Sequence, residues 1–431
     1  MKLNHLGFKP VFRAGLFSIL ATAAIQTAGA AEAAKGQDYF TCTVPAQAGQ
    51  PKQVEANKAV VRRYLEALGT SRFDAVLKDV KGAGYKELRD EFENLKYNLD
   101  ADLTAAAKPA AKAIPDRKNE VTCIIAEGDL VAAVTKVTGT HKDNFMGIPA
   151  TNKSFDFAGV GIFKLANGKI NEAWLMADEA KFMRAIGARL PARKDGKLIA
   201  PPVHNDTREF DDVLAEYLAK PVDSAEFRHK VLLLSYKAKN KPQSYTDYLS
   251  KYTTAGGRVY AEYLRAGNQN TVDMLAKFKE EGKVISGAYG SAWGNRQDRL
   301  SNIMAEGDVG MFQFRMTALN AGPLYVIPAS NKQISAWEVG FNSFVGDKWQ
   351  TAWYLGDELG EMLQIGSKEA QEFLLGDASS LPAIATAAPP ADGMGGGADG
   401  MGGGADGMAA GGGMGAGGGM GAGGMGAEGG Q

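Results

Sequence analysis

The sequence predicts an α+β protein in which one unit, a curved antiparallel sheet wrapped around helices, occurs twice in tandem. Segments of the chain recur at a constant spacing of 179 residues, which is typical of a repeated structural unit. In both copies helical periodicity comes first and period-two alternation follows. The matching segments are 126–129 with 305–308 (AEGD), 148–150 with 327–329 (IPA) and 173–174 with 352–353 (AW).

Each predicted unit begins with a pair of amphipathic helices. Apolar residues recur at three- and four-residue intervals in residues 57–68 and 71–80, which predicts two helices with one apolar face each. A similar pair returns within residues 230–249. A third helical stretch precedes the strands of each copy, at residues 101–113 in the first and 271–281 in the second.

The strand-rich half of the first copy is an antiparallel meander. Asn167-Gly168 is a dipeptide favoured in tight two-residue turns, and it separates the last two strands. Gly346-Asp347 fills the same place in the second copy. Alternation of apolar and polar residues predicts strands at 121–125, 130–137, 155–165 and 170–176.

Composition divides the rest of the chain into segments. A proline-rich basic stretch reads as a linker, and the last residues are almost wholly Gly, Ala, Met and Asp, a composition that predicts disorder. The predicted organisation is a signal peptide (1–30), an N-terminal arm (31–52), a first domain (53–190), a linker (191–205), a second domain (206–375) and a disordered tail (376–431).

The N-terminus has the pattern of a secretory signal. Basic residues precede an apolar run, and Ala28-Gly29-Ala30 forms a small-residue cleavage site. The alternative is a short membrane anchor, but the apolar run falls short of the roughly 20 residues that span a bilayer. We therefore expect a secreted or periplasmic protein without stable membrane insertion.

Charge and motif content exclude several classes of function. The 431 residues carry a net charge of −1, so no basic surface for nucleic acid or anionic membranes is expected. Metal-ligand spacings and phosphate-binding glycine loops are missing from the sequence. Regularly spaced methionines in the tail could hold a soft ion such as Cu(I), but the tail has no Cys or His. We expect neither a metal nor another cofactor.

Two cysteines, Cys42 and Cys123, follow the signal region. In an oxidising compartment they could form a disulfide that ties the arm to the first predicted strand. The alternative is two buried free thiols.

Three stretches carry a family resemblance: GTHKDNFMGIPATNK (139–153), FAGVGIFKLANGKINEAW (157–174), and Asp178 with Ile186-Gly187. They resemble the SnoaL-like polyketide cyclase family, which shares a cone-shaped fold with nuclear transport factor two. The resemblance is specific over residues 57–187 and weaker over about 226–366. It implies helices that close the mouth of a strongly bent sheet and an apolar pocket inside.

One face of the last predicted strand is the expected wall of that pocket. Side-chain alternation places Trp174, Met176 and Asp178 on the same side. A carboxyl group beside an indole is poorly solvated, so its pKa should rise toward the range of a general acid or base. The alternative is that Asp178 and its counterpart Asp357 are helix N-caps. Trp353 occupies the position equivalent to Trp174.

The family resemblance implies a histidine on the preceding strand as partner of the catalytic aspartate. Lys164 stands at that position in the first copy and Ser343 in the second. His141, in the GTH turn, is the remaining candidate, with an exposed loop position as the alternative. The catalytic candidates are therefore Asp178, His141 and Lys164, and the ligand-binding candidates are Trp174, Met176, Trp353 and Asp357.

Three functions are consistent with these patterns. The first is an exported protein whose two cones form an intramolecular pseudo-dimer and bind a small apolar molecule, with further oligomerisation left open. The second is an acid/base enzyme of cyclase, isomerase or hydratase type that uses Asp178. The third is a protein-interaction or scaffold module that assembles through the tail.

Overall fold

The computed structural model describes residues 39–45, 51–98, 107–188, 201, 207–252, 262–264, 269–346, 348–367 and 369–370. The predicted signal peptide and tail, and nearly all of the predicted linker, lie outside the described residues. Within the described part, no helix is long and apolar enough to cross a membrane.

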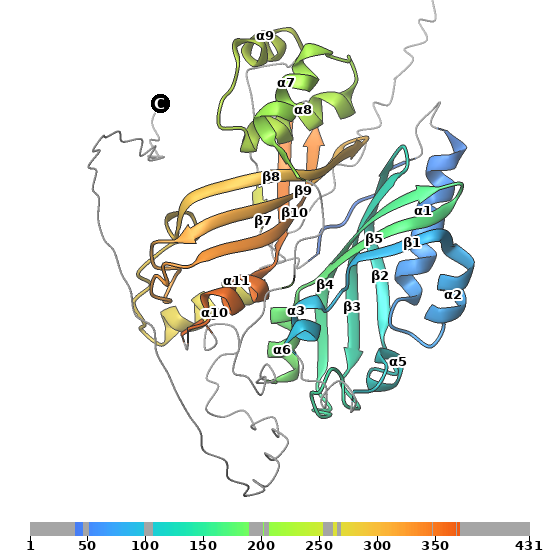
Figure 1. The fold of residues 1–431 in the computed structure, drawn as a ribbon, viewed down its shortest axis with the longest axis vertical. Coiled ribbons are helices and arrows are strands. Elements are labelled where there is room, and N and C mark those ends of the chain that lie inside the picture. The colour runs from blue at the N-terminus through green and yellow to red at the C-terminus, as the bar shows by residue number, and fades with distance from the viewer. Residues whose placement is uncertain are drawn as a thin grey trace, which may run out of the picture. The chain divides into compact units, whose positions relative to one another are not determined.

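The first sheet has five strands in the order β1-β5-β4-β3-β2 (Figure 1). The four predicted strands are confirmed, with neighbours paired antiparallel. The additional strand β1 was not predicted, and it pairs parallel to β5 at the edge of the sheet. The bounds are β1 (Lys81–Arg89), β2 (Lys118–Glu127), β3 (Leu130–Thr140), β4 (Ser154–Ala166) and β5 (Lys169–Ala177).

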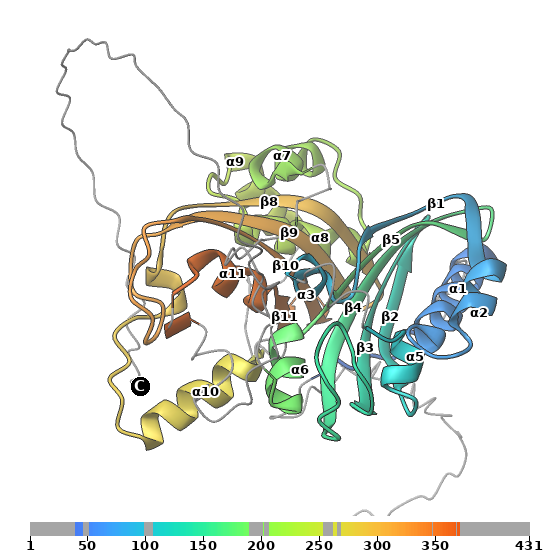
Figure 2. The same cartoon turned by 60° about the horizontal axis from the view of Figure 1, so that its bottom comes forward.

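Helix α1 (Lys52–Ala67) packs on β2, and α2 (Phe73–Val80) follows it, as the periodicity predicted (Figure 2). Gly69 separates them with a φ of 67°, a conformation that glycine adopts at little cost. Of the predicted helix at residues 101–113, residues 101–106 lie outside the described residues. The remaining helices of this unit are α3 (Glu93–Tyr97), α5 (Ala110–Ala113) and α6 (Glu179–Ile186).

The second sheet repeats the strand order of the first, with one short strand added at its edge. Its order is β6-β8-β9-β10-β11-β7, and β7 pairs parallel to β11 as β1 does to β5. This topology is compatible with two copies of one unit. The strands are β6 (Arg208–Glu209), β7 (Glu262–Leu264), β8 (Trp293–Glu306), β9 (Val309–Asn320), β10 (Gln333–Val345) and β11 (Lys348–Gly356).

The helices of the second unit also follow the prediction. The predicted pair within residues 230–249 corresponds to α8 (Ala225–Lys237) and α9 (Gln243–Tyr252), and the predicted third helix to α10 (Gln269–Glu280). The others are α7 (Phe210–Ala219), the 3-10 turn Tyr289–Ser291 and α11 (Glu358–Ile365). The predicted α+β fold with curved antiparallel sheets is thus confirmed.

The tight turn between β4 and β5 is formed by the predicted dipeptide. Asn167 and Gly168 both have positive φ, 52° and 70°, which a two-residue turn of this type requires. Gly346 has a φ of 59° at the equivalent place. This turn starts the pairing of β4 with β5, which contains one register shift between Lys164 and Leu165.

Side chains fill the space between the helices and the sheet in the first unit. Tyr64 of α1 makes edge contact with Phe163 of β4 at 5.2 Å between ring centroids. Further along the sheet, α3 and α6 cover a cluster of phenylalanines. Its members are Phe92, Phe145, Phe155, Phe157 and Phe182, all at most 5% exposed.

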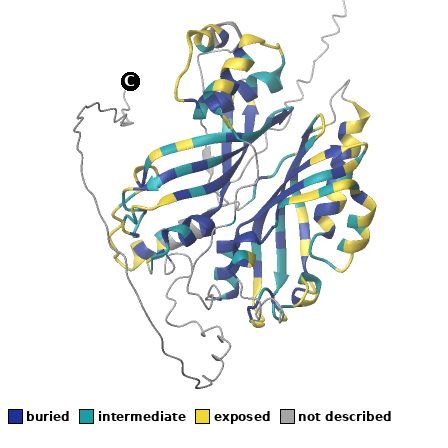
Figure 3. Cartoon of the chain, viewed as in Figure 1, coloured by how far each residue is buried: buried dark blue, intermediate teal, exposed yellow. Residues whose placement is uncertain are grey.

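The opposite face of the first sheet packs against the second sheet. Trp174 contacts Trp337 at 5.8 Å between ring centroids, and Met176 and Trp353 belong to the same apolar cluster. These strand faces are buried, whereas the outer sides of α1 and α2 are exposed (Figure 3). Trp174, Met176 and Trp353 therefore lie between two sheets and not inside one cone. The alternation of side chains correctly placed these residues on one face of their strands. It does not show which of the two faces of a sheet is covered by helices.

Candidate functional site

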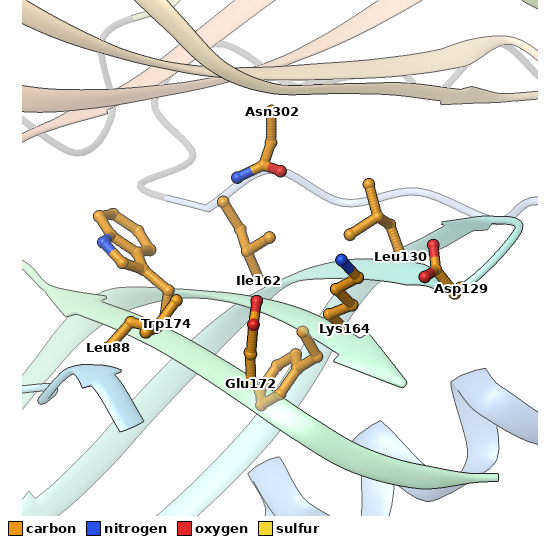
Figure 4. Close-up of a pocket in the computed structure, with 9 residues that line it drawn as sticks. Leu88, Asp129, Leu130, Ile162, Lys164, Glu172, Trp174 and Asn302 are labelled. Atoms are coloured by element: carbon orange, nitrogen blue, oxygen red, sulfur yellow. The ribbon is translucent and has the colours of Figure 1, made fainter. Parts of the chain in front are cut away.

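A cavity of about 220 Å³ lies at the edge of this inter-sheet packing (Figure 4). Its walls come from the first sheet, except for Asn302 of β8. It contains two of the predicted site residues, Lys164 and Trp174. The lining residues are Leu88, Asp129, Leu130, Ile162, Phe163, Lys164, Glu172, Trp174 and Asn302.

Strand register brings the polar and apolar parts of this cavity together. Lys164 of β4 lies directly opposite Glu172 of β5. Trp174 is two residues beyond Glu172, so alternation places both side chains on the same face. Ile162 lies opposite Trp174 in the same way.

The charged groups of the cavity are not committed to other partners. In the described part of the chain, the side chains of Lys164, Glu172 and Asp129 make no hydrogen bond or ion pair. Asn302 differs, because its Nδ2 donates to Gln313 Oε1 at 2.6 Å. Trp174 and Ile162 are 3% and 4% exposed and form an apolar floor. An apolar floor with a few free polar groups at its rim is the usual composition of a small-molecule site.

Asp178 does not belong to this cavity. Its Oδ1 accepts a hydrogen bond from the Lys181 backbone N–H at 3.0 Å, so it is the N-cap of α6. The Asp178 backbone N–H donates to the carbonyl oxygen of Ala158 on β4. Ala158 precedes Lys164 by six residues on that strand, a separation of about 20 Å at the usual rise per residue. The expected pairing of Asp178 with position 164 is therefore not formed.

His141 is buried, so the alternative of an exposed loop position was wrong. Its Nδ1 lies 3.1 Å from Thr151 Oγ1, and burial lowers the pKa of the imidazole. Its counterpart Asn320 accepts hydrogen bonds from the N–H and Oγ of Ser330 at 2.8 and 2.9 Å. Both side chains hold the same turn through these bonds, whereas His141 Nε2 is buried with no hydrogen-bond partner among the described residues.

A buried polar cluster joins the two units, and the sequence did not reveal it. Arg89 Nη2 contacts Asp357 Oδ2 at 2.9 Å, and Asn94 Nδ2 donates to Asp357 Oδ1 at 2.6 Å. Asn94 Nδ2 also donates to Glu179 Oε1 at 3.0 Å. Asp357, predicted to bind ligand, is therefore a structural contact and the N-cap of α11. Arg89 and Asn94 were not predicted as site residues, because Arg89 ends the unpredicted strand β1 and Asn94 lies in the short helix α3 that follows it.

Burial sets the protonation of this cluster. Desolvation, together with the neighbouring Asp357 carboxylate, raises the pKa of Glu179 to about 8, although Arg89 acts in the opposite direction. Desolvation likewise raises the pKa of Glu93 to about 7. The raised pKa of Glu179 reduces the negative charge that Arg89 has to compensate.

We expect the raised pKa of Glu179 to make the protein progressively less stable as the pH rises from about 4.5 to about 8. A carboxyl group whose pKa is raised by folding contributes stability below its unfolded pKa and loses it as the pH rises through the folded value of about 8. Denaturation midpoints at several pH values measure the effect. Glu179→Gln should flatten the profile in this window, and an equally steep profile in that variant would assign the loss to other groups.

Residues 58–186 match the model of the SnoaL-like polyketide cyclase family. The predicted resemblance is thus confirmed over the first unit. The match supports a small-molecule-binding fold for these residues. No curated protein matches the chain.

Solved structures align with about a third of the chain. One, assigned as a SnoaL-like polyketide cyclase from Jannaschia sp. CCS1, is 20% identical, covers 32% of this chain and 97% of its own, and has a TM-score of 0.27. AclR of Streptomyces galilaeus, assigned as a hydroxylase, is 25% identical over 31% and 97%, with a TM-score of 0.26. TsrD of Streptomyces laurentii is 19% identical over 31% and 96%, with a TM-score of 0.26.

Proposed function

We propose that this protein binds a small molecule in the cavity between its two sheets. The observation that carries the proposal is the set of uncommitted charged side chains, Lys164, Glu172 and Asp129, above an indole floor. A polar group of the ligand can pair with one of these side chains while its apolar part packs on the buried indole of Trp174. The ligand would have a flat apolar body against Trp174 and a polar group facing Lys164.

Binding is favoured over acid/base turnover by the position of Asp178. Its carboxylate caps α6, and the strand register separates it from Lys164. A general acid or base must lie within hydrogen-bond reach of the reacting atom. In the proposed cavity the charged groups that could transfer a proton are Lys164, Glu172 and Asp129, so we assign no catalytic role to Asp178.

We further propose that the protein acts outside the cytoplasm as two tandem SnoaL-like units. The signal pattern at residues 1–30 supports export, and so does the Cys42–Cys123 disulfide, with 2.03 Å between the sulfurs. The shared strand order supports the tandem organisation, with domain bounds at about 53–190 and 206–375. In this reading the second sheet completes the cavity through Asn302.

The proposal is tested by native mass spectrometry of the protein purified from its own host, followed by calorimetric titration with the retained molecule. Lys164→Met should weaken its binding at least tenfold, because the cation at the rim is lost. Lys142→Met, at an exposed lysine in the turn after β3, is the matched control and should change nothing. Equal affinities for parent and Lys164→Met proteins would place the ligand elsewhere.

A further inference from the structure

A second cavity, of about 360 Å³, lies on the first unit beside the end of α1 and the start of β2. It is separate from the inter-sheet cavity and shares no lining residue with it. Four of its lining side chains are cationic and two are acidic. The cations are Arg62, Arg72, Arg117 and Lys118, and the acids are Glu66 and Glu120.

Arg117 is a fixed part of this cavity. Its Nη2 contacts both carboxylate oxygens of Glu91 at 2.7 Å, and its Nε donates to Asn119 Oδ1 at 2.9 Å. The side chain is only 2% exposed, so its orientation is set by the protein. Its Nη1 has no hydrogen-bond partner among the described residues. A Cβ at Gly69 would lie 2.7 Å from Nη1, so glycine in this turn leaves room beside the guanidinium.

The second unit has the same arginine in a different setting. Arg296 lies 179 residues after Arg117, and its Nε donates to Asp298 Oδ1 at the same 2.9 Å. Lys237 Nζ contacts Asp298 at 2.9 Å, and Arg296 Nη2 contacts Glu338 at 3.0 Å. Ion pairs within the second unit therefore occupy the charges at this equivalent place.

In the first unit the extra cations are left for a ligand. Arg62 and Lys118 make no hydrogen bond or ion pair with any described residue, and Arg72 Nη2 contacts only the Glu66 carbonyl at 3.4 Å. Glu91 balances Arg117, which leaves three cations against the carboxylates of Glu66 and Glu120. The local excess is positive, on a chain whose net charge is −1.

From this charge distribution, we propose that the cavity binds a small organic anion through a carboxylate or phosphate group. Guanidinium groups recognise both groups with paired hydrogen bonds, and two line this cavity besides Arg117: Arg62 of α1 and Arg72, which precedes α2. The preorganised Arg117 reduces the entropy that binding would otherwise cost. The site is independent of the proposed inter-sheet cavity.

Calorimetric titration of the full chain with inorganic phosphate and with succinate, at constant ionic strength in chloride buffer, tests this site. The parent protein should show saturable binding of at least one of them, and the preferred anion identifies the group recognised. The double variant Arg62→Ala/Lys118→Ala should weaken that binding at least tenfold.

Arg63→Ala is the matched control, since Arg63 is the next residue on α1 and pairs with Asp79 at the surface. It should bind within twofold of the parent, and Lys164→Met should also leave anion binding unchanged. Failure of the parent to bind either anion saturably would overturn the proposal. So would an equal loss in Arg63→Ala and the double variant, because binding would then follow net charge and not this cavity.

Discussion

Replacing Arg89 with methionine is expected to lower the free energy of unfolding by about 3–5 kcal/mol. Arg89 and Asp357 are 4% and 7% exposed, and their contact joins the end of β1 to the N-terminus of α11. Without the guanidinium, Asp357 stays buried beside Glu93 and Glu179 with no cation to compensate it. Denaturant titration of parent and variant at pH 7 measures the loss.

Two further variants show whether the stability lost in Arg89→Met comes from an uncompensated buried charge or only from the loss of a side chain. Arg63→Ala breaks an exposed ion pair with Asp79 and should cost at most about 1 kcal/mol. Adding Asp357→Asn to Arg89→Met should recover part of the stability, because the uncompensated charge is removed. If Arg89→Met costs no more than Arg63→Ala, the cluster does not contribute as the structure implies.

Removing the disulfide with Cys42→Ser/Cys123→Ser is expected to cost about 4 kcal/mol. The bridge spans 81 residues of sequence, so its loss greatly increases the freedom of the unfolded chain. It also releases the arm, whose Phe40 is 1% exposed and contacts Phe341 and Trp353 of the second unit. Denaturation with and without reductant gives the difference.

The serine variant provides the control for this experiment. Reductant should destabilise the parent to the level of the variant and leave the variant unchanged. Phe40→Ala, with the disulfide intact, should cost about 3–5 kcal/mol by the usual scale for a buried phenylalanine. A parent protein indifferent to reductant would show that the arm is not held by this bond.

The chain alone predicted the elements that depend on local patterns. The α1–α2 pair followed from helical periodicity, and the β4–β5 turn followed from Asn167-Gly168, where positive φ is a local requirement. Strand β1 was missed because its residues (KGAGYKELR) include two glycines and alternate poorly. Its pairing with β5 depends on a parallel contact between segments about ninety residues apart, which no local pattern encodes.

The candidate site divides in the same way. Alternation correctly placed Trp174 and Met176 on one face of the strand, and the family resemblance pointed to position 164. In the observed register Lys164 lies opposite Glu172. Asp178 follows β5 beside the other end of β4, where it caps helix α6. Family spacing alone could not decide this, because it fixes positions in the sequence and not which residues lie opposite each other.

The sequence by itself predicted a repeat, most of the helices and strands, and the family resemblance of residues 58–186. Periodicity and turn chemistry act between residues close in the chain, so they can be read from it directly. Only the tertiary structure decided that the indole face of β5 meets a second sheet, that Arg89 reaches Asp357, and that three charged side chains border one cavity. These contacts join residues far apart in sequence, and their energies depend on burial, which exists only once the sheets have packed.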